Sequence, residues 1–169
     1  GQEMSAAERA IQWRLPYIRL LDAAGGSVRT FEDYGRTYLP DGSARTQYDV
    51  ALMNLVPTAS AVLGSVAGLP AIEACMAHFS VMVKGISQIF PGGPPVVKAA
   101  LGLDITKEEL GGDHIHTKLS GCIDNVAETE QDAFDQIRRF LSYLPSSVHE
   151  MPPRGPVTDD PNRQEESLV

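Results

Sequence analysis

Apolar residues alternate between helical spacing and short continuous runs along the chain, which predicts an α/β fold. Helices are expected over residues 5–15, 46–56 and 95–101. Three further helices are expected: one that begins at Pro70, one that follows Thr106, and one from Thr129 to about Leu144. The expected strands are 17–21, the apolar run that begins at Ala59, 78–83 and 87–90. Residues 28–45 are predicted as a surface excursion with a helical turn at 31–34, and 114–123 as irregular or extended.

Polar residues just ahead of the apolar patterns mark where helices begin. Ser5 with Glu8 and Thr106 with Glu109 have capping-box spacing, and Thr129 precedes the longest apolar stripe. After Pro145 the chain becomes rich in proline and charge. We therefore expect residues 1–150 to form the folded part and 151–169 a linker or mobile arm toward a further domain.

The stretch from Ala59 to Ala74 reads as a buried strand, a glycine-containing turn and a helix opened by Pro70. Backbone N–H groups at such a junction lack partners within the helix, so the turn could bind an anion or a developing oxyanion. A second small-residue turn, 23–27, follows the strand at 17–21. Ligands of open α/β sheets bind beyond the carboxyl ends of strands, so both turns are candidates for one site. An ordinary buried turn remains the alternative.

Charge and composition limit the classes of partner that the chain could bind. The chain has 169 residues, a formal net charge of −8 and a pI near 4.9, which argues against nucleic acid as a partner. No apolar run is long enough to span a bilayer, so we expect no membrane association and a cytoplasmic location. The two cysteines, Cys75 and Cys122, are too few for a disulfide framework and are predicted to be small buried side chains.

Other candidate chemistry is incomplete in this sequence. His114 and His116 would face one side of a strand, but only Asp113 offers a further ligand nearby, so no metal site is expected. Ser65 lies one residue away from the spacing of a nucleophile elbow. Lys98, after a double-glycine turn, is either a phosphate ligand or a solvated charge.

Several segments, taken in order, resemble the carboxyltransferase (beta) subunit of biotin-dependent acyl-CoA carboxylases, of the propionyl-CoA and methylcrotonyl-CoA type. They are 15–18 leading into 21–26, Ala67-Gly68, 93–100, 108–116, 120–124 and 141–145. The resemblance implies a crotonase-like (ClpP/crotonase) fold, a superhelix of ββα units of which this chain is a partial domain. It also implies transfer of a carboxyl group from carboxybiotin to the α-carbon of an acyl-CoA.

The resemblance further implies partners and site residues. Biotin would be carried on a partner carrier domain, and a homo-oligomer, by resemblance a hexamer, would work with a biotin carboxylase/biotin carrier subunit, in the mitochondrial matrix if the source is eukaryotic. The backbone N–H groups of Gly68 and Leu69 would stabilise the enolate, although Leu69 stands where the family has glycine. The residues implied to line the acyl-CoA site are Ala67, Ala24, Gly25, Gly26, Ser27, Gly93 and Lys98.

Two other functions stay open. A hydratase or isomerase of the same fold would need carboxylates at the turn, and only Glu73 is near it. A non-catalytic subunit that binds acyl-CoA or assists assembly would tolerate the change at Leu69. The chain matches only the later part of the family's acyl-CoA-binding domain, so by itself it is expected not to complete a carboxylation.

Overall fold

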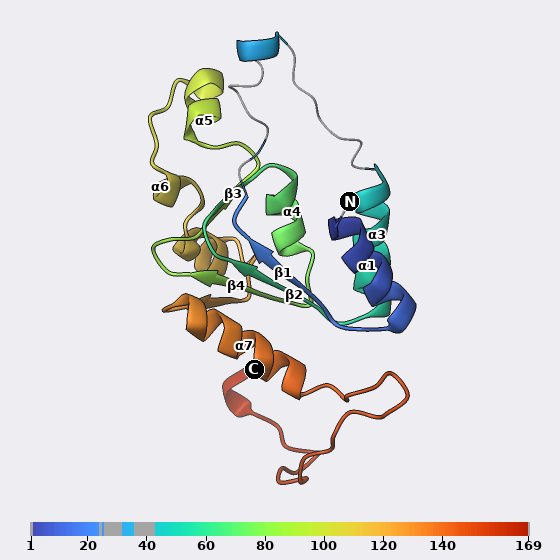
Figure 1. Cartoon of the computed structure of the whole chain (residues 1–169). Coiled ribbons are helices and arrows are strands. Elements are labelled where there is room, and N and C mark those ends of the chain that lie inside the picture. The colour runs from blue at the N-terminus through green and yellow to red at the C-terminus, as the bar shows by residue number, and fades with distance from the viewer. Residues whose placement is uncertain (1, 24, 26–31, 36–42, 169) are drawn as a thin grey trace.

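Four parallel strands form the central sheet, in the order β1-β2-β4-β6 (Figure 1). This computed structural model describes residues 2–23, 25, 32–35 and 43–168. The strands are β1 (Tyr17–Leu21), β2 (Thr58–Val62), β4 (Phe79–Val83) and β6 (Asn125–Ala127). Strand β2 is buried on both faces, as expected for the interior of a parallel sheet. Three of these strands agree with the sequence prediction, and β6 was not predicted.

A second, two-stranded parallel sheet pairs β3 (Ser65–Ala67) with β5 (Gln88–Phe90). The chain therefore runs twice from the central sheet into the second sheet and then into a helix, giving successive ββα units. The helix after β3 is α4 (Leu69–Cys75), and the helix after β5 is α5 (Pro94–Leu101). The prediction of one strand, a turn and a helix over 59–74 was incomplete, because the turn itself contains β3.

Helices cover both faces of the central sheet (Figure 1). On one face α4 closes a buried cluster that includes Val62, Ala74 and Ile123. On the other face α7 (Glu130–Ser142) packs on Ala61 and Val81, and its predicted apolar stripe is confirmed by the burial of Ala133 and Ile137. Helices α1 (Gln2–Trp13) and α3 (Ser43–Leu55) pack together around a third cluster.

Strand β1 lies at the edge of the central sheet. Its side chains alternate between buried and exposed, with Leu21 buried and Ile18 and Leu20 exposed by 41% and 57%. On the buried face Arg19 forms an ion pair with Asp49 and donates a hydrogen bond to the backbone carbonyl of Met76, 3.1 Å away. The edge strand thus presents two large apolar side chains on its open face.

Helix boundaries follow the predicted caps in two of three cases. Thr106 caps α6 (Lys107–Gly111) in a complete capping box with Glu109, and Thr129 caps α7. The cap predicted at Ser5 was wrong, because α1 already begins at Gln2. That helix also stops earlier than expected: Arg14 has a positive φ of 55° and the Leu15 N–H donates to Ala10 O at 3.0 Å.

The segment predicted to be irregular or extended at 114–123 contains a short π-helix, η1 (Ile115–Leu119), so this prediction was wrong. The ring of His116 explains its position, because Nε2 lies 2.9 Å from the carbonyl oxygen of Ile89 and Nδ1 lies 3.2 Å from Ser120 Oγ. The helical turn predicted near 31–34 is present at 32–34, while residue 31 lies outside the described part.

Residues 148–167 are all exposed, and they contain no strand and only part of the 3₁₀ turn η2 (Glu166–Leu168). The predicted linker role of 151–169 remains a prediction. Among the described residues, no helix is both long and apolar enough to cross a bilayer. Cys75 and Cys122 are exposed, so their predicted burial was wrong.

Candidate functional site

The two small-residue turns predicted from the sequence meet in space. The Ala67 N–H donates a hydrogen bond to Ala23 O at 3.0 Å, which ties the end of β3 to the turn after β1. Gly25 lies against the same segment, since a Cβ placed on it would be 3.6 Å from Ala67 Cβ. A Cβ placed on Gly68 would be 3.8 Å from Gly25 Cα. The structure therefore brings Ala67, Gly68 and Gly25 together, whereas Ala24, Gly26 and Ser27 lie outside the described residues.

Gly68 does not have the free donor expected of it. Its N–H donates a hydrogen bond to Phe90 O at 3.2 Å, extending the ladder between β3 and β5 by one residue. Its backbone has φ 74° and ψ −140°, a conformation that favours glycine. The role of Gly68 as an oxyanion donor is thus corrected, because the amide is already used within the second sheet. Gly68 instead turns the chain from β3 into α4.

The backbone N–H of Leu69 is the next hydrogen-bond donor at this junction. Pro70 has no N–H, and the Ala71 N–H donates to Gly68 O at 3.0 Å. The Leu69 N–H makes no hydrogen bond with any residue that the structure describes. The Leu69 side chain is 39% exposed, so it does not fill the core. One backbone amide is therefore available at the start of α4, one residue after Gly68.

The contact between Asp22 and Gly64 holds the turn after β1 against the end of β2. The Asp22 carboxylate occupies the space where a Cβ on Gly64 would lie, so a larger residue there would displace this carboxylate. Next to this contact, the Leu63 N–H donates to Leu21 O at 2.8 Å. Both contacts fix where the chain leaves β1 relative to the end of β2.

Of the two weaker candidates, only Gly93 lies near these turns. A Cβ on Gly93 would be 3.2 Å from the Phe90 ring, and Phe90 O is the acceptor for Gly68. Lys98 is elsewhere on the surface of α5: its side chain is 64% exposed and its ammonium lies 2.6 Å from Asp104 Oδ1. The structure thus explains Lys98 as a surface ion pair.

Glu73, the carboxylate that a hydratase or isomerase would need, is only 1% exposed and faces inward from α4. Ser65 donates to Gln88 Oε1 at 2.6 Å and accepts from Lys107 Nζ at 3.2 Å, without a histidine beside it among the described contacts. Within the described ranges no three histidine, cysteine or acidic side chains gather as a metal site would require.

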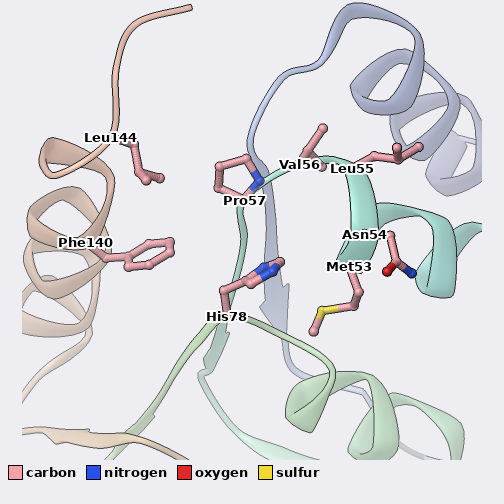
Figure 2. Close-up of a pocket in the computed structure, with 8 residues that line it drawn as sticks. All are labelled: Met53, Asn54, Leu55, Val56, Pro57, His78, Phe140 and Leu144. Carbon is pink, nitrogen blue, oxygen red and sulfur yellow. The ribbon is translucent and has the colours of Figure 1, made fainter. Parts of the chain in front are cut away.

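A hollow of about 370 Å³ lies at the opposite end of the central sheet (Figure 2). Figure 2 shows Phe140 of α7, and Leu144 just beyond its end, facing Pro57 and His78 across it. The imidazole of His78 is held from β2, because its Nδ1 accepts the Thr58 N–H at 3.1 Å. The hollow is lined by Met53, Asn54, Leu55, Val56, Pro57, His78, Phe140 and Leu144. None of the predicted site residues lines this hollow.

The model of the carboxyl transferase domain family matches residues 2–169. The chain belongs to this family. The chain is 34% identical, over 95% of its length, to a propionyl-CoA carboxylase carboxyltransferase subunit of Haloferax mediterranei. It is 32% identical, over 94% of its length, to a methylmalonyl-CoA decarboxylase subunit alpha of Veillonella parvula. The chain spans 30% of the length of each of these two relatives.

Solved structures of carboxyl transferases share the fold. A transcarboxylase 12S structure with bound methylmalonyl-coenzyme A and methylmalonic acid has a TM-score of 0.71 and 28% identity, covering 85% of this chain and 27% of that one. A second 12S structure, with hydrolysed methylmalonyl-coenzyme A bound, has a TM-score of 0.74 and 27% identity, covering 92% and 30%. The crotonase-like fold that the resemblance implies is confirmed, with the chain forming part of it.

Sequence reasoning missed the contribution of Phe90 to this junction. Phe90 offers only its carbonyl oxygen to Gly68, so its side chain gives no sign of the contact. The available signal was the repeat itself: in a stack of ββα units, the short strand of each unit pairs with the short strand of the next. Pairing 65–67 with 88–90 would have placed Gly68 at the end of the ladder.

Proposed function

We propose that this chain forms part of the acyl-CoA site of a biotin-dependent carboxyltransferase, which moves a carboxyl group between biotin and the α-carbon of an acyl-CoA thioester. The family match over residues 2–169 carries the proposal. The two relatives named above are a carboxylase subunit and a decarboxylase subunit. Both directions pass through the same thioester enolate, so the proposal holds for either.

In this proposal the Leu69 N–H donates a hydrogen bond to the thioester oxygen as it gains negative charge. A donor that is already fixed in place stabilises the enolate more than the neutral thioester, and this difference lowers the barrier. The amide is fixed because Gly68 is tied to Phe90 on one side and Ala71 is tied to Gly68 on the other. The identity of the side chain at Leu69 does not change the donor.

Gly25 and Ala67 would form the wall beside the thioester. They lie in contact, and neither has a large side chain, so a substrate can approach the backbone closely. Gly26, Ser27 and Ala24 remain expected members of the same wall. Gly93 would extend the wall past Phe90. Lys98 is not included, because its ammonium pairs with Asp104.

The proposed partners follow from the family. Biotin on a partner carrier domain would deliver or accept the carboxyl group, and none of the residues named above is assigned to hold it. A homo-oligomer is proposed because the 12S relative is described as a hexamer assembly, with a biotin carboxylase/biotin carrier subunit completing the enzyme. Residues 151–169 would lead toward a further domain, and the complex would work in the cytoplasm.

Leu69→Pro tests the donor, since proline removes the N–H at a helix position that proline occupies readily. In the assembled enzyme, carboxyl transfer to propionyl-CoA should fall by about 10²–10³-fold in kcat. Leu69→Ala is the matched control and should retain most of the activity. Circular dichroism and the melting temperature of both variants establish that they fold. Equal activity in the Leu69→Pro and Leu69→Ala enzymes would show that this amide is not the donor.

A non-catalytic acyl-CoA-binding subunit is the second candidate, favoured by the fact that the Gly68 amide is already used by Phe90. Calorimetric titration with propionyl-CoA and a transfer assay on the same preparation separate the two. Binding without transfer in the assembled complex would support the second candidate. Binding accompanied by transfer that Leu69→Pro abolishes would support the first.

A further inference from the structure

Ser120 and His116 form a hydrogen-bonded pair at the end of the π-helix η1. Ser120 Oγ lies 3.2 Å from Nδ1 of the His116 ring, four residues earlier in the chain. Ser120 is exposed, whereas His116 is partly buried. A hydroxyl that is open to solvent and next to an imidazole can act as a nucleophile, because the imidazole can take its proton. The pair therefore combines the two groups with which a serine enzyme attacks an ester.

The backbone of β5 decides which nitrogen of the His116 ring carries the hydrogen. Nε2 lies 2.9 Å from the carbonyl oxygen of Ile89, and a carbonyl oxygen can only accept a hydrogen bond. In the neutral ring Nε2 is therefore the donor, and Nδ1 has the lone pair that accepts the hydrogen bond of the Ser120 hydroxyl. The contact with Ile89 thus holds the ring in the tautomer that a general base for Ser120 requires.

Gly111 leaves the Ile89 carbonyl open to the imidazole of His116. A Cβ on Gly111 would lie 2.1 Å from Ile89 O, so a side chain at this position would force the backbone of β5 or of α6 to move. The carbonyl has the place that a carboxylate has in a catalytic triad. It orients the imidazole, and its partial negative charge stabilises the imidazolium that forms when Nδ1 takes a proton.

Backbone N–H groups lie beside the hydroxyl of Ser120. The Cys122 N–H donates to Ser120 Oγ at 3.4 Å. Between them, Gly121 has a positive φ of 65°, and its N–H makes no hydrogen bond with any residue that the structure describes. Ser120 itself is helical, with φ −89° and ψ −27°. A helical residue followed by one with positive φ directs successive N–H groups to one side, where they can stabilise negative charge.

We propose that Ser120 and His116 form a nucleophilic site that hydrolyses small carboxylic esters through an acyl-serine intermediate. Ser120 Oγ attacks the ester carbonyl carbon and passes its proton to His116 Nδ1. The bond between this carbon and the alcohol oxygen then breaks, and the alcohol leaves with the proton from Nδ1. A water molecule next attacks the acyl group, with Nδ1 as the base, and the carboxylic acid is released. The net reaction consumes one ester and one water and restores both side chains.

The exposure of the site determines which esters it takes. Ser120 lies at the surface, and the apolar residue before it in the chain, Leu119, is 75% exposed. An open site of this kind offers little binding energy, so its substrates are esters that react without it. Small esters with a good leaving group, such as p-nitrophenyl acetate, belong to this class.

The site lies on the other edge of β5 from the turn at Gly68. Phe90 O accepts the Gly68 N–H on the side of β3, whereas Ile89 O, one residue earlier, accepts from His116. Successive carbonyl groups of a strand point to opposite edges, so the chemistry at Ser120 does not depend on the donor proposed at Leu69. The two proposals can therefore fail independently.

Labelling of the purified full chain with a fluorophosphonate tests the nucleophile. The reagent forms a bond from phosphorus to an activated serine oxygen and loses fluoride. Cleavage with trypsin at Lys118 and Arg138 gives a peptide in which Ser120 is the only serine, so mass spectrometry locates the label. We expect the label on this peptide, and a burst of about one equivalent of p-nitrophenol per chain from p-nitrophenyl acetate. An unlabelled chain, or a label only on other peptides, would overturn the proposal.

Two variants separate the nucleophile from the base. Ser120→Ala should lose both the label and the burst. His116→Gln retains an N–H donor toward Ile89 O but has no basic nitrogen, so the rate of p-nitrophenol release should fall by about 10²-fold. Because Ser120→Ala retains the neighbouring Cys122 thiol, a burst that persists in this variant would assign the reaction to the thiol and overturn the proposal.

Ser142→Ala is the matched control for a surface serine. Ser142 is also exposed, but its hydroxyl donates to the backbone carbonyl of Arg139 at 2.7 Å and not to an imidazole. Labelling and p-nitrophenol release should therefore be the same as in the parent chain. Circular dichroism and the melting temperature establish that all three variants fold. An equal loss of activity in Ser142→Ala and Ser120→Ala would contradict a specific role for Ser120.

Discussion

The amide of Gly68 donates its hydrogen bond to the carbonyl oxygen of Phe90, 3.2 Å away, and so joins two successive ββα units at the start of α4. The same residue has φ 74° and ψ −140°. A single glycine thus ends one strand ladder and sets the direction of the following helix. The neighbouring Leu69 amide has no hydrogen-bond partner among the described residues, and its position depends on Gly68.

Gly68→Ala should destabilise the chain through backbone conformation. The nearest atom to an added Cβ is 3.8 Å away, so space is available, but an L-residue rarely adopts this φ. We expect the free energy of unfolding to fall by about 1–3 kcal/mol, measured by urea denaturation. Gly155→Ala, in the exposed tail and without a close neighbour, is the control and should have no effect. Equal stability of both variants would contradict the conformational role.

Asp49→Ala should be strongly destabilising, because it leaves the buried Arg19 guanidinium without its carboxylate. Both side chains are under 10% exposed, so water cannot replace the lost partner. Removing one member of a buried pair costs about 3–5 kcal/mol. Glu128→Ala is the control, since the pair of Glu128 with Lys84 is exposed and contributes at most about 1 kcal/mol. Urea denaturation of both variants measures the contrast, and a similar small loss in both would be the contrary result.

The stability of the α6 cap should depend on pH in the acid range. Hydrogen bonds from the Thr106 side chain and then its backbone hold the pKa of Glu109 below its ordinary value of about 4.3. The folded state therefore favours the ionised carboxylate. This stabilisation is fully present above the unfolded pKa and disappears as the pH falls through the folded pKa.

An NMR titration of the side-chain carboxyl groups measures this effect. Thr106→Ala should return the pKa of Glu109 toward its ordinary value and cost about 1 kcal/mol through loss of the helix cap. Asp135 is the internal control, because its pKa is lowered by Gln131 and then by Arg138 and should not respond. A Glu109 titration that is the same with and without Thr106 would show that the cap does not set this pKa.

Leu20→Lys should reduce self-association of the purified chain. Leu20 is 57% exposed on the open face of the edge strand β1, where a lysine opposes strand pairing and apolar contact. Light scattering at rising protein concentration should show less association, while the free energy of unfolding changes by at most about 0.5 kcal/mol. Val157→Lys, at a 92% exposed tail residue, is the control. An equal effect of Val157→Lys would mean that general charge, and not the strand edge, is responsible.

The features that the sequence predicted correctly depend on neighbours close in the chain. Thr106 and Glu109 form their capping box within one helical turn, and the apolar stripe of α7 repeats along a helix of 13 residues. Strand β3 was missed because three residues between Gly64 and Gly68 are too few for a pattern. The two turns were placed at one site by the rule that ligands bind beyond the carboxyl ends of strands, and the resemblance to a family added the fold.

The errors at the site and in η1 share a physical cause. The Gly68 amide was expected to be free because helix N-termini leave such groups unpaired, but its acceptor, Phe90, is 22 positions away and is reached only through sheet pairing. Likewise, the contact of His116 with Ile89 fixes a helical segment whose sequence looks irregular. Contacts between units decide these cases, and a single sequence does not reveal them.

The proposed use of a main-chain amide at Leu69 affects how distant family members should be recognised. A search pattern that demands two glycines after the central strand would discard this chain, although the hydrogen-bonding group is intact. The pattern that matches the chemistry requires glycine at the first place, where the backbone conformation demands it, and any residue except proline at the second. Genomic surveys built on that rule would retain carboxyltransferase-like sequences that the stricter signature excludes.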